Sequence, residues 1–117
     1  MSDYTIYHNP RCSKSRETLA LLEHAGISAR VVEYLKTPPT AAELKAIVTK
    51  LGIEPEQLVR KSEDVYKSRY AGKTLSAAQW IEALVEHPVL IERPIVIKGK
   101  QAILGRPPEN VKKLLGD

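Results

Sequence analysis

The first part of the chain constrains the fold most, because it alternates between strand-like and helix-like patterns. Residues 4–8 are rich in β-branched and aromatic residues, which favours a strand. An Asn-Pro pair ends that pattern, and residues 13–26 then carry apolar side chains at helical spacing before a glycine. Residues 30–34 resemble a second short strand. This order is that of a βαβ unit, which predicts a parallel or mixed sheet.

The middle of the chain is predicted to be mostly helical. Thr40 and Glu43 have the spacing of a capping box, and the helix that they begin should extend to Leu51. We expect a short helix over residues 54–60 and a longer one after Ser76. Between them, residues 66–73 combine tyrosine with basic residues. Such a mixture can bind nucleic acid, but we interpret it as a solvated loop.

The end of the chain returns to strands. A tight turn at residues 99–100 should join strands over residues 95–98 and 101–104, and a last helix is predicted over residues 109–115. The whole order fits an α/β, thioredoxin-like fold with a small mixed sheet and a helical insertion. With 117 residues, of which 43% are hydrophobic, the chain is expected to form one domain over residues 1–117.

Composition excludes several classes of protein. No run of about 18 apolar residues indicates a membrane span, and the N-terminus lacks the pattern of a signal peptide, so we expect a cytoplasmic protein. The net charge of +4 comes from scattered basic residues, which predicts solvated side chains and not a nucleic-acid surface. His24 and His87 lack the spacing of metal ligands, so no metal site is predicted.

Cys12 is the one cysteine, so the chain cannot form an internal disulfide or a metal site of several thiolates. It follows a strand and a proline turn and precedes a helix. The N–H groups and dipole of a helix N-terminus stabilise an anion, which lowers the pKa of a thiol there. His8, at the end of the strand, could donate a hydrogen bond to the sulfur. A lone cysteine can instead be a small buried apolar residue, but this setting favours a reactive thiolate.

Two further groups of residues could bind an anion near Cys12. Ser13, Ser15 and the backbone amides after Cys12 form a possible anion cradle, although serine is also common at helix starts. Arg60, Arg93 and Arg106 are candidates because the planar guanidinium group donates paired hydrogen bonds to tetrahedral oxyanions. Each of them could be an ordinary surface arginine, and their convergence on Cys12 is a hypothesis.

Several segments together resemble a known family. The chain is similar to the arsenate reductases that use glutathione and glutaredoxin, in order and at family spacing, over residues 7–16, 34–40, 58–61, 87–96 and 105–107. The resemblance implies a thioredoxin-like fold with extra helices and a cis-proline at Pro94. Spx-type regulators, which bind RNA polymerase, belong to the same superfamily. Many of them carry Cys-x-x-Cys, whereas this chain has Ser15 at the second position.

The resemblance also implies a mechanism. Cys12 would attack arsenate, His8 would help to hold the thiolate, and the oxyanion would be bound by Arg60, Arg93 and Arg106. We add Ser15 to the expected substrate-binding residues because of its place at the helix start. Glutathione, as a co-substrate and not a bound cofactor, would attack the Cys12–arsenic adduct. Glutaredoxin would then resolve the mixed disulfide and release arsenite, a route that needs no second protein cysteine.

Two alternatives keep the same scaffold. The chain could be a glutathione-dependent thiol reductase of another substrate, or a non-enzymatic, Spx-like regulator that binds RNA polymerase. Arg11 and Lys14 are bulky and charged where relatives often carry small or neutral residues. These two side chains could strengthen anion binding or crowd the site.

Overall fold

The computed structural model describes residues 4–114, which fall into two compact units. Residues 4–37 and 93–114 form the first unit, and residues 38–92 form the second. That residues 1–117 make a single domain remains a prediction. Each unit is described below by itself.

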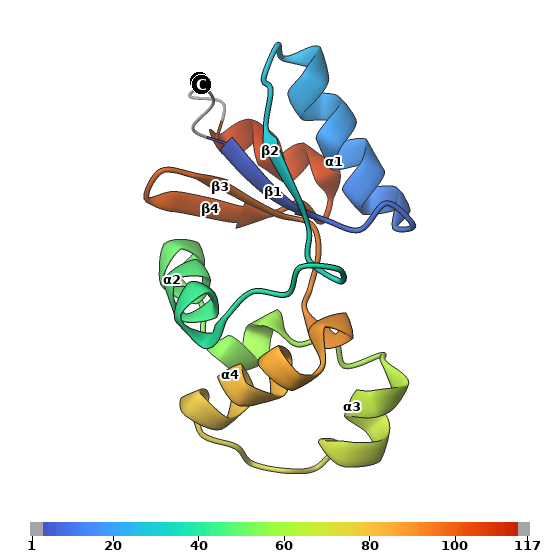
Figure 1. Ribbon diagram of the computed structural model, residues 1–117, viewed down its shortest axis with the longest axis vertical. Coiled ribbons are helices and arrows are strands. Elements are labelled where there is room, and N and C mark those ends of the chain that lie inside the picture. Colours follow the sequence, from blue (N-terminus) through green and yellow to red (C-terminus); the bar gives the residue numbers. More distant parts are fainter. Residues whose placement is uncertain (1–3, 115–117) are drawn as a thin grey trace. The chain divides into compact units, whose positions relative to one another are not determined.

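The first unit contains a four-stranded mixed sheet (Figure 1). Its order is β2-β1-β3-β4, and its strands are β1 (Tyr4–His8), β2 (Arg30–Glu33), β3 (Ile95–Lys98) and β4 (Gln101–Leu104). Strand β1 runs parallel to β2 and antiparallel to β3, and β3 and β4 form an antiparallel hairpin. The predicted mixed sheet is therefore confirmed, and β1 is an inner strand.

Two helices cover one face of this sheet. Helix α1 (Ser13–His24) packs against the 3₁₀ helix η3 (Pro108–Leu114), and the sheet contributes Ile6 and Val96 to their shared core. The tyrosine that begins β1 donates its hydroxyl hydrogen to the Leu114 carbonyl at 2.9 Å. The predicted last helix is thus confirmed as a 3₁₀ helix, and the part of that prediction at residue 115 lies outside the described residues.

The second unit is the helical insertion expected between the two halves of the sheet. It contains α2 (Ala41–Leu51), η1 (Pro55–Leu58), α3 (Asp64–Arg69), α4 (Ala77–Glu86) and η2 (Pro88–Leu90). Helix α4 is central, because it packs against α2, η1 and η2. Both predicted helix starts are confirmed, since Thr40 and Ser76 each complete a capping box with the residue three positions on.

The prediction of a loop at residues 66–73 is wrong in its first part. Helix α3 extends to Arg69, and the two tyrosines lie against a tryptophan of α4. Tyr66 stacks on Trp80 with ring centroids 6.3 Å apart, and Tyr70 lies 5.9 Å from the same ring. Ring packing of these partly buried tyrosines against Trp80 stabilises a short helix whose own sequence has little apolar periodicity. These tyrosines therefore contribute to packing.

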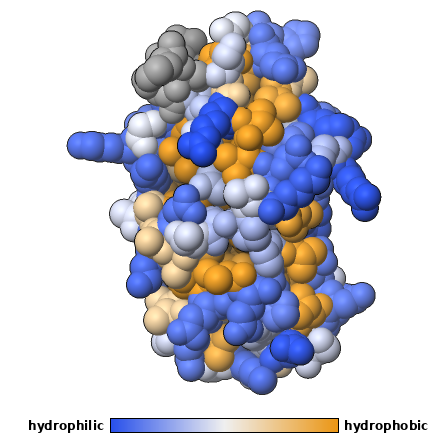
Figure 2. Space-filling view, viewed as in Figure 1, coloured by the Kyte–Doolittle hydropathy of each residue, from blue (hydrophilic) through white to orange (hydrophobic). Residues whose placement is uncertain are grey.

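Hydrophilic side chains cover much of the face shown in Figure 2, and apolar residues show between them in separate places. Within residues 4–114, no helix is both long and apolar enough to cross a membrane.

Gly105, just after β4, lies where three elements of the first unit meet. A Cβ at this position would lie 2.6 Å from Thr18 Oγ1 on α1 and 2.7 Å from Pro94 Cγ. The Gly105 N–H donates to the Pro94 carbonyl at 2.9 Å, so the backbones are already close. Only glycine fits between the helix and the rigid proline ring. This close approach fixes the position of the backbone at the next residue, Arg106.

We expect Gly105→Ala to lower the free energy of unfolding by about 1–3 kcal/mol, because the added methyl group overpacks this contact. Urea denaturation measures the change. Gly72→Ala is the control: its methyl group meets nothing within 4 Å, although Gly72 has a φ of 79°. Its cost should be about 1 kcal/mol and should come from the backbone alone. A Gly105→Ala protein as stable as wild type would contradict the close packing.

Candidate active site

Cys12 is the N-cap residue of α1, as predicted from the sequence. Its backbone N–H donates to the Asn9 carbonyl at 2.9 Å, and its carbonyl accepts the first helical hydrogen bond, from the Arg16 N–H, at 3.0 Å. The side chain is partly exposed. The sulfur is therefore accessible and lies beside the unpaired N–H groups of the first helical turn.

The loop that precedes Cys12 is held by the buried hydroxyl of Ser15. The Asn9 N–H donates to Ser15 Oγ at 3.0 Å, and His8 Nδ1 lies 2.7 Å from the same oxygen. The Asn9 side chain in turn accepts from the Arg11 N–H at 3.0 Å. Asn9 was not among the predicted site residues. The Asn-Pro turn was the signal that could have identified it, because asparagine often bonds its own backbone two residues on.

The hydrogen-bond partner of His8 in the structure is Ser15 and not the Cys12 sulfur that we expected from the sequence. Burial lowers the pKa of His8, the charge of Arg16 lowers it further, and Glu33 opposes both effects. The neutral His8 ring can accept a hydrogen bond from the Ser15 hydroxyl at Nδ1, while Ser15 Oγ accepts one from the Asn9 N–H. The ring nitrogen, the hydroxyl and the N–H then each have a hydrogen-bond partner. Among residues 4–114, His8 makes no hydrogen bond to Cys12; it supports the loop through Ser15.

The pKa of the Cys12 thiol is lowered overall by groups that surround the sulfur. Partial burial alone would raise this pKa. The backbone N–H of Ser15, the side chain and charge of Arg93, and the backbone N–H of Lys14 lower it by more. Ser15 therefore offers the sulfur its backbone N–H, as the predicted anion cradle requires, while its hydroxyl faces the loop.

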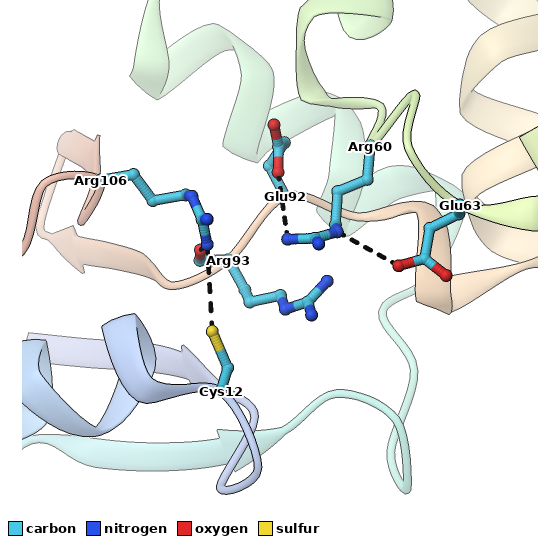
Figure 3. Close-up of polar contacts among 6 residues, drawn as sticks. All are labelled: Cys12, Arg60, Glu63, Glu92, Arg93 and Arg106. Carbon is cyan, nitrogen blue, oxygen red and sulfur yellow. Dashed lines mark hydrogen bonds and ion pairs between the residues drawn. The ribbon is translucent and has the colours of Figure 1, made fainter.

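Arg93 and Arg106 both extend to the side of Cys12 where the sulfur lies (Figure 3). Arg106 Nη1 is 3.9 Å from Cys12 Sγ and donates to the Arg93 carbonyl at 3.1 Å. The peptide bonds of Arg93-Pro94 and Arg106-Pro107 are both cis. The first was expected and the second was not. Two of the three predicted arginines thus meet at Cys12.

The guanidinium of Arg93 has unused hydrogen-bonding capacity. Its Nε and Nη1 atoms are buried, and within residues 4–114 neither has a hydrogen-bond partner. A buried charged donor without a partner costs free energy comparable to a lost hydrogen bond, about 1–3 kcal/mol or more. An anion that entered beside Cys12 could accept from both atoms.

Arg60 belongs to the second unit and carries two acidic partners there. Arg60 Nε lies 3.4 Å from a carboxylate oxygen of Glu63, and Nη1 lies 3.7 Å from one of Glu92 (Figure 3). Neither glutamate was predicted. Glu63 was detectable from its spacing three residues after Arg60, whereas Glu92 is distant in the sequence. That Arg60 reaches the same anion as Cys12 remains a prediction.

No group of three or more His, Cys, Asp or Glu side chains in the described part of the chain could hold a metal ion.

Comparisons with known proteins agree on one family. The ArsC family profile matches residues 7–114. An arsenate reductase of Haemophilus influenzae is 50% identical over 112 residues, which cover 94% of this chain and 97% of that protein. The uncharacterized protein YfgD of Escherichia coli K12 is 49% identical over 113 residues, with 95% of both chains covered. The arsenate reductase structure from Vibrio cholerae has 50% identity and a TM-score of 0.91, and covers 94% of this chain and 95% of that one. The thioredoxin-like α/β class is thereby confirmed.

The lowered pKa of Cys12 predicts that the thiol reacts with iodoacetamide at lower pH than an ordinary cysteine does. Arg93→Gln removes a charge and a donor that stabilise the thiolate. The midpoint of the alkylation rate against pH should therefore rise, and the thiolate fraction at neutral pH should fall. Arg30→Gln, which removes an equal charge at the exposed start of β2, is the control and should leave the midpoint unchanged. Equal midpoints for Arg93→Gln and wild type would contradict the role of Arg93.

Proposed function

The chain belongs to the ArsC family, and we propose that it reduces arsenate to arsenite through the Cys12 thiolate, with glutathione and glutaredoxin as reductants. The substrate is supported by the relatives that are named arsenate reductases, at 40–50% identity over most of the chain. The external thiols are supported by composition, because a chain with one cysteine cannot form a disulfide within itself.

One observation carries the proposal: the Cys12 thiol, whose pKa is lowered, lies beside the Arg93 guanidinium, which has donors without hydrogen-bond partners among residues 4–114. Arg93 faces the Cys12 sulfur and keeps two buried donors without partners in the described structure. Arg106 adds a second guanidinium beside the sulfur. A tetrahedral oxyanion would accept from the Arg93 donors while its central atom lies within reach of the thiolate.

In the first step the Cys12 thiolate attacks arsenic and forms a sulfur–arsenic bond. One arsenate oxygen takes up protons and leaves as water, and arsenic keeps its oxidation state. Arg93 and Arg106 stabilise the negative charge on the remaining oxygens, and Arg60 is proposed as the third arginine at this anion. The backbone N–H groups of Lys14 and Ser15 stabilise the thiolate before it attacks.

In the second step a glutathione thiolate attacks Cys12 Sγ and forms a mixed disulfide. The sulfur–arsenic bond breaks, and its electron pair stays on arsenic, which is reduced from As(V) to As(III) and leaves as arsenite. Glutaredoxin then reduces the mixed disulfide by thiol exchange and restores Cys12. His8 and Ser15 are proposed to hold the loop through this cycle. The reaction belongs in the cytoplasm, where glutathione keeps thiols reduced.

The direct test is NADPH oxidation in a mixture of arsenate, glutathione, glutaredoxin and glutathione reductase. We expect wild-type protein to consume NADPH only when arsenate and glutathione are both present, and Cys12→Ser to show no activity above background. Ser28→Ala, at an exposed position between α1 and β2, is a suitable control.

The two alternative functions give different results in that assay. A folded wild-type protein that forms a glutathione mixed disulfide at Cys12 but never reduces arsenate would be a thiol reductase of another substrate. A regulator would bind its protein partner equally well as wild type and as Cys12→Ser. Either result would overturn arsenate reduction.

We expect Arg93→Lys and Arg106→Lys each to slow arsenate reduction by about 10²–10³, because a point charge replaces a planar pair of donors at the transition state. Steady-state rates at saturating glutathione measure the effect. Arg30→Lys is the matched control at an exposed site and should retain the wild-type rate. Near wild-type rates for both Arg93→Lys and Arg106→Lys would show that the anion binds elsewhere.

A further inference from the structure

We propose that a pocket beside the Cys12 loop binds the γ-glutamyl end of glutathione. This pocket has a volume of about 200 Å³ and lies between the loop before Cys12 and the segment that follows β2. Its lining includes His8, Asn9, Arg11, Glu33, Leu35 and Lys36. The inference rests on the proposed function, in which glutathione is the thiol that reacts at Cys12.

The pocket lies beside the loop that leads into Cys12 and does not use the anion site. Its wall from His8 to Arg11 leads directly into Cys12, whose N–H is bonded to the Asn9 carbonyl. Arg93 and Arg106 are not among its lining residues. A thiol ligand held here therefore does not compete with an oxyanion for the same side chains.

The charges of the pocket match the γ-glutamyl end of glutathione. That end carries an ammonium and a carboxylate on one carbon, so it needs one acidic and at least one basic partner. Glu33 supplies the acidic group, and Arg11 and Lys36 supply the basic ones. Glu33 and His8 line the same pocket, and the Glu33 charge raises the pKa of His8 against the effect of burial.

Without a ligand, two charged residues of the pocket, Glu33 and Lys36, form a weak ion pair with each other that a ligand can replace. Lys36 Nζ lies 3.5 Å from Glu33 Oε1, and the two side chains are 79% and 41% exposed. An ion pair this exposed contributes little to stability. A zwitterion that enters between them exchanges this one pair for three, with its ammonium on Glu33 and its carboxylate on Lys36 and Arg11.

The size of glutathione suits this arrangement. Its thiol is on the residue next to the γ-glutamyl group, and only two methylene groups and one peptide bond separate the Cα atoms of these two residues. An anchored γ-glutamyl end therefore keeps the thiol close to the Cys12 loop. Leu35, which is 46% exposed at the rim, offers an apolar surface for the methylene groups of the ligand.

Thiol–disulfide exchange tests the pocket without arsenate. The Cys12 thiolate attacks glutathione disulfide, a bond forms between Cys12 and one glutathione, and the other glutathione leaves as a thiolate. The rate is compared with that of the disulfide of cysteinylglycine, which lacks the γ-glutamyl residue. Mass spectrometry follows both adducts. The ratio of the two rates cancels any change in the reactivity of Cys12 itself.

Glu33→Gln is the decisive variant, because the two explanations predict opposite signs. If only long-range charge mattered, removal of a negative group would raise the rate with anionic glutathione disulfide. If Glu33 binds the ammonium, the ratio falls, by about three- to tenfold for one charged contact at a partly exposed site. Lys36→Gln, a change at an exposed side chain, should lower the ratio too. Glu23→Gln, on the exposed side of α1, is the matched control.

The expected result is a lower ratio for Glu33→Gln and Lys36→Gln, an unchanged ratio for Glu23→Gln, and the same losses when γ-glutamylcysteine disulfide replaces glutathione disulfide. A ratio for Glu33→Gln that is unchanged or raised overturns the pocket, even in a protein that reduces arsenate. Conversely, the expected pattern in a protein that cannot reduce arsenate supports the pocket and refutes only the proposed substrate.

Discussion

The proposed chemistry of the molecule depends on stabilising one negative charge, that of the Cys12 thiolate at the start of α1. Partial burial opposes this charge, and the backbone N–H groups of the first helical turn together with Arg93 outweigh it. The same guanidinium keeps buried donors for a second anion. A thiolate and an oxyanion repel each other, so a site that joins them needs more positive charge than either one alone, and Arg106 supplies part of it.

Some polar groups around the loop before Cys12 hold the loop in place, and others face the sulfur. The Ser15 hydroxyl faces inward and joins His8 to Asn9, whereas the Ser15 backbone N–H faces the sulfur. A loop whose side chains bond one another leaves its main-chain donors free for ligands and holds them in place, which favours catalysis by preorganised dipoles. The backbone N–H of Arg11 belongs to this network, whereas its exposed side chain is proposed to contact a co-substrate.

Local patterns predicted what local interactions determine. The strands, the capping boxes at Thr40 and Ser76 and the position of Cys12 each depend on a few adjacent residues. Contacts between distant residues were not accessible in this way. Helix α3 depends on Trp80, and the requirement for glycine at position 105 comes from Thr18 and Pro94 and not from its own backbone angles. The two carboxylates beside Arg60 show the same limit, since only the nearer one has a helical spacing.

The sheet order has a consequence for how the thiol becomes reactive during synthesis. Strand β1 pairs with β2 early in the chain, but its other edge is completed by β3, which follows the whole helical insertion. Chains emerge from the ribosome N-terminus first. Cys12 is therefore made long before Arg93 and Arg106, and it remains closer to an ordinary thiol until the last quarter of the chain has paired with the first. The share of the activation that Arg93 supplies therefore arises only when the fold is completed, so a partly made chain exposes a less activated cysteine to the oxidants and disulfides around it.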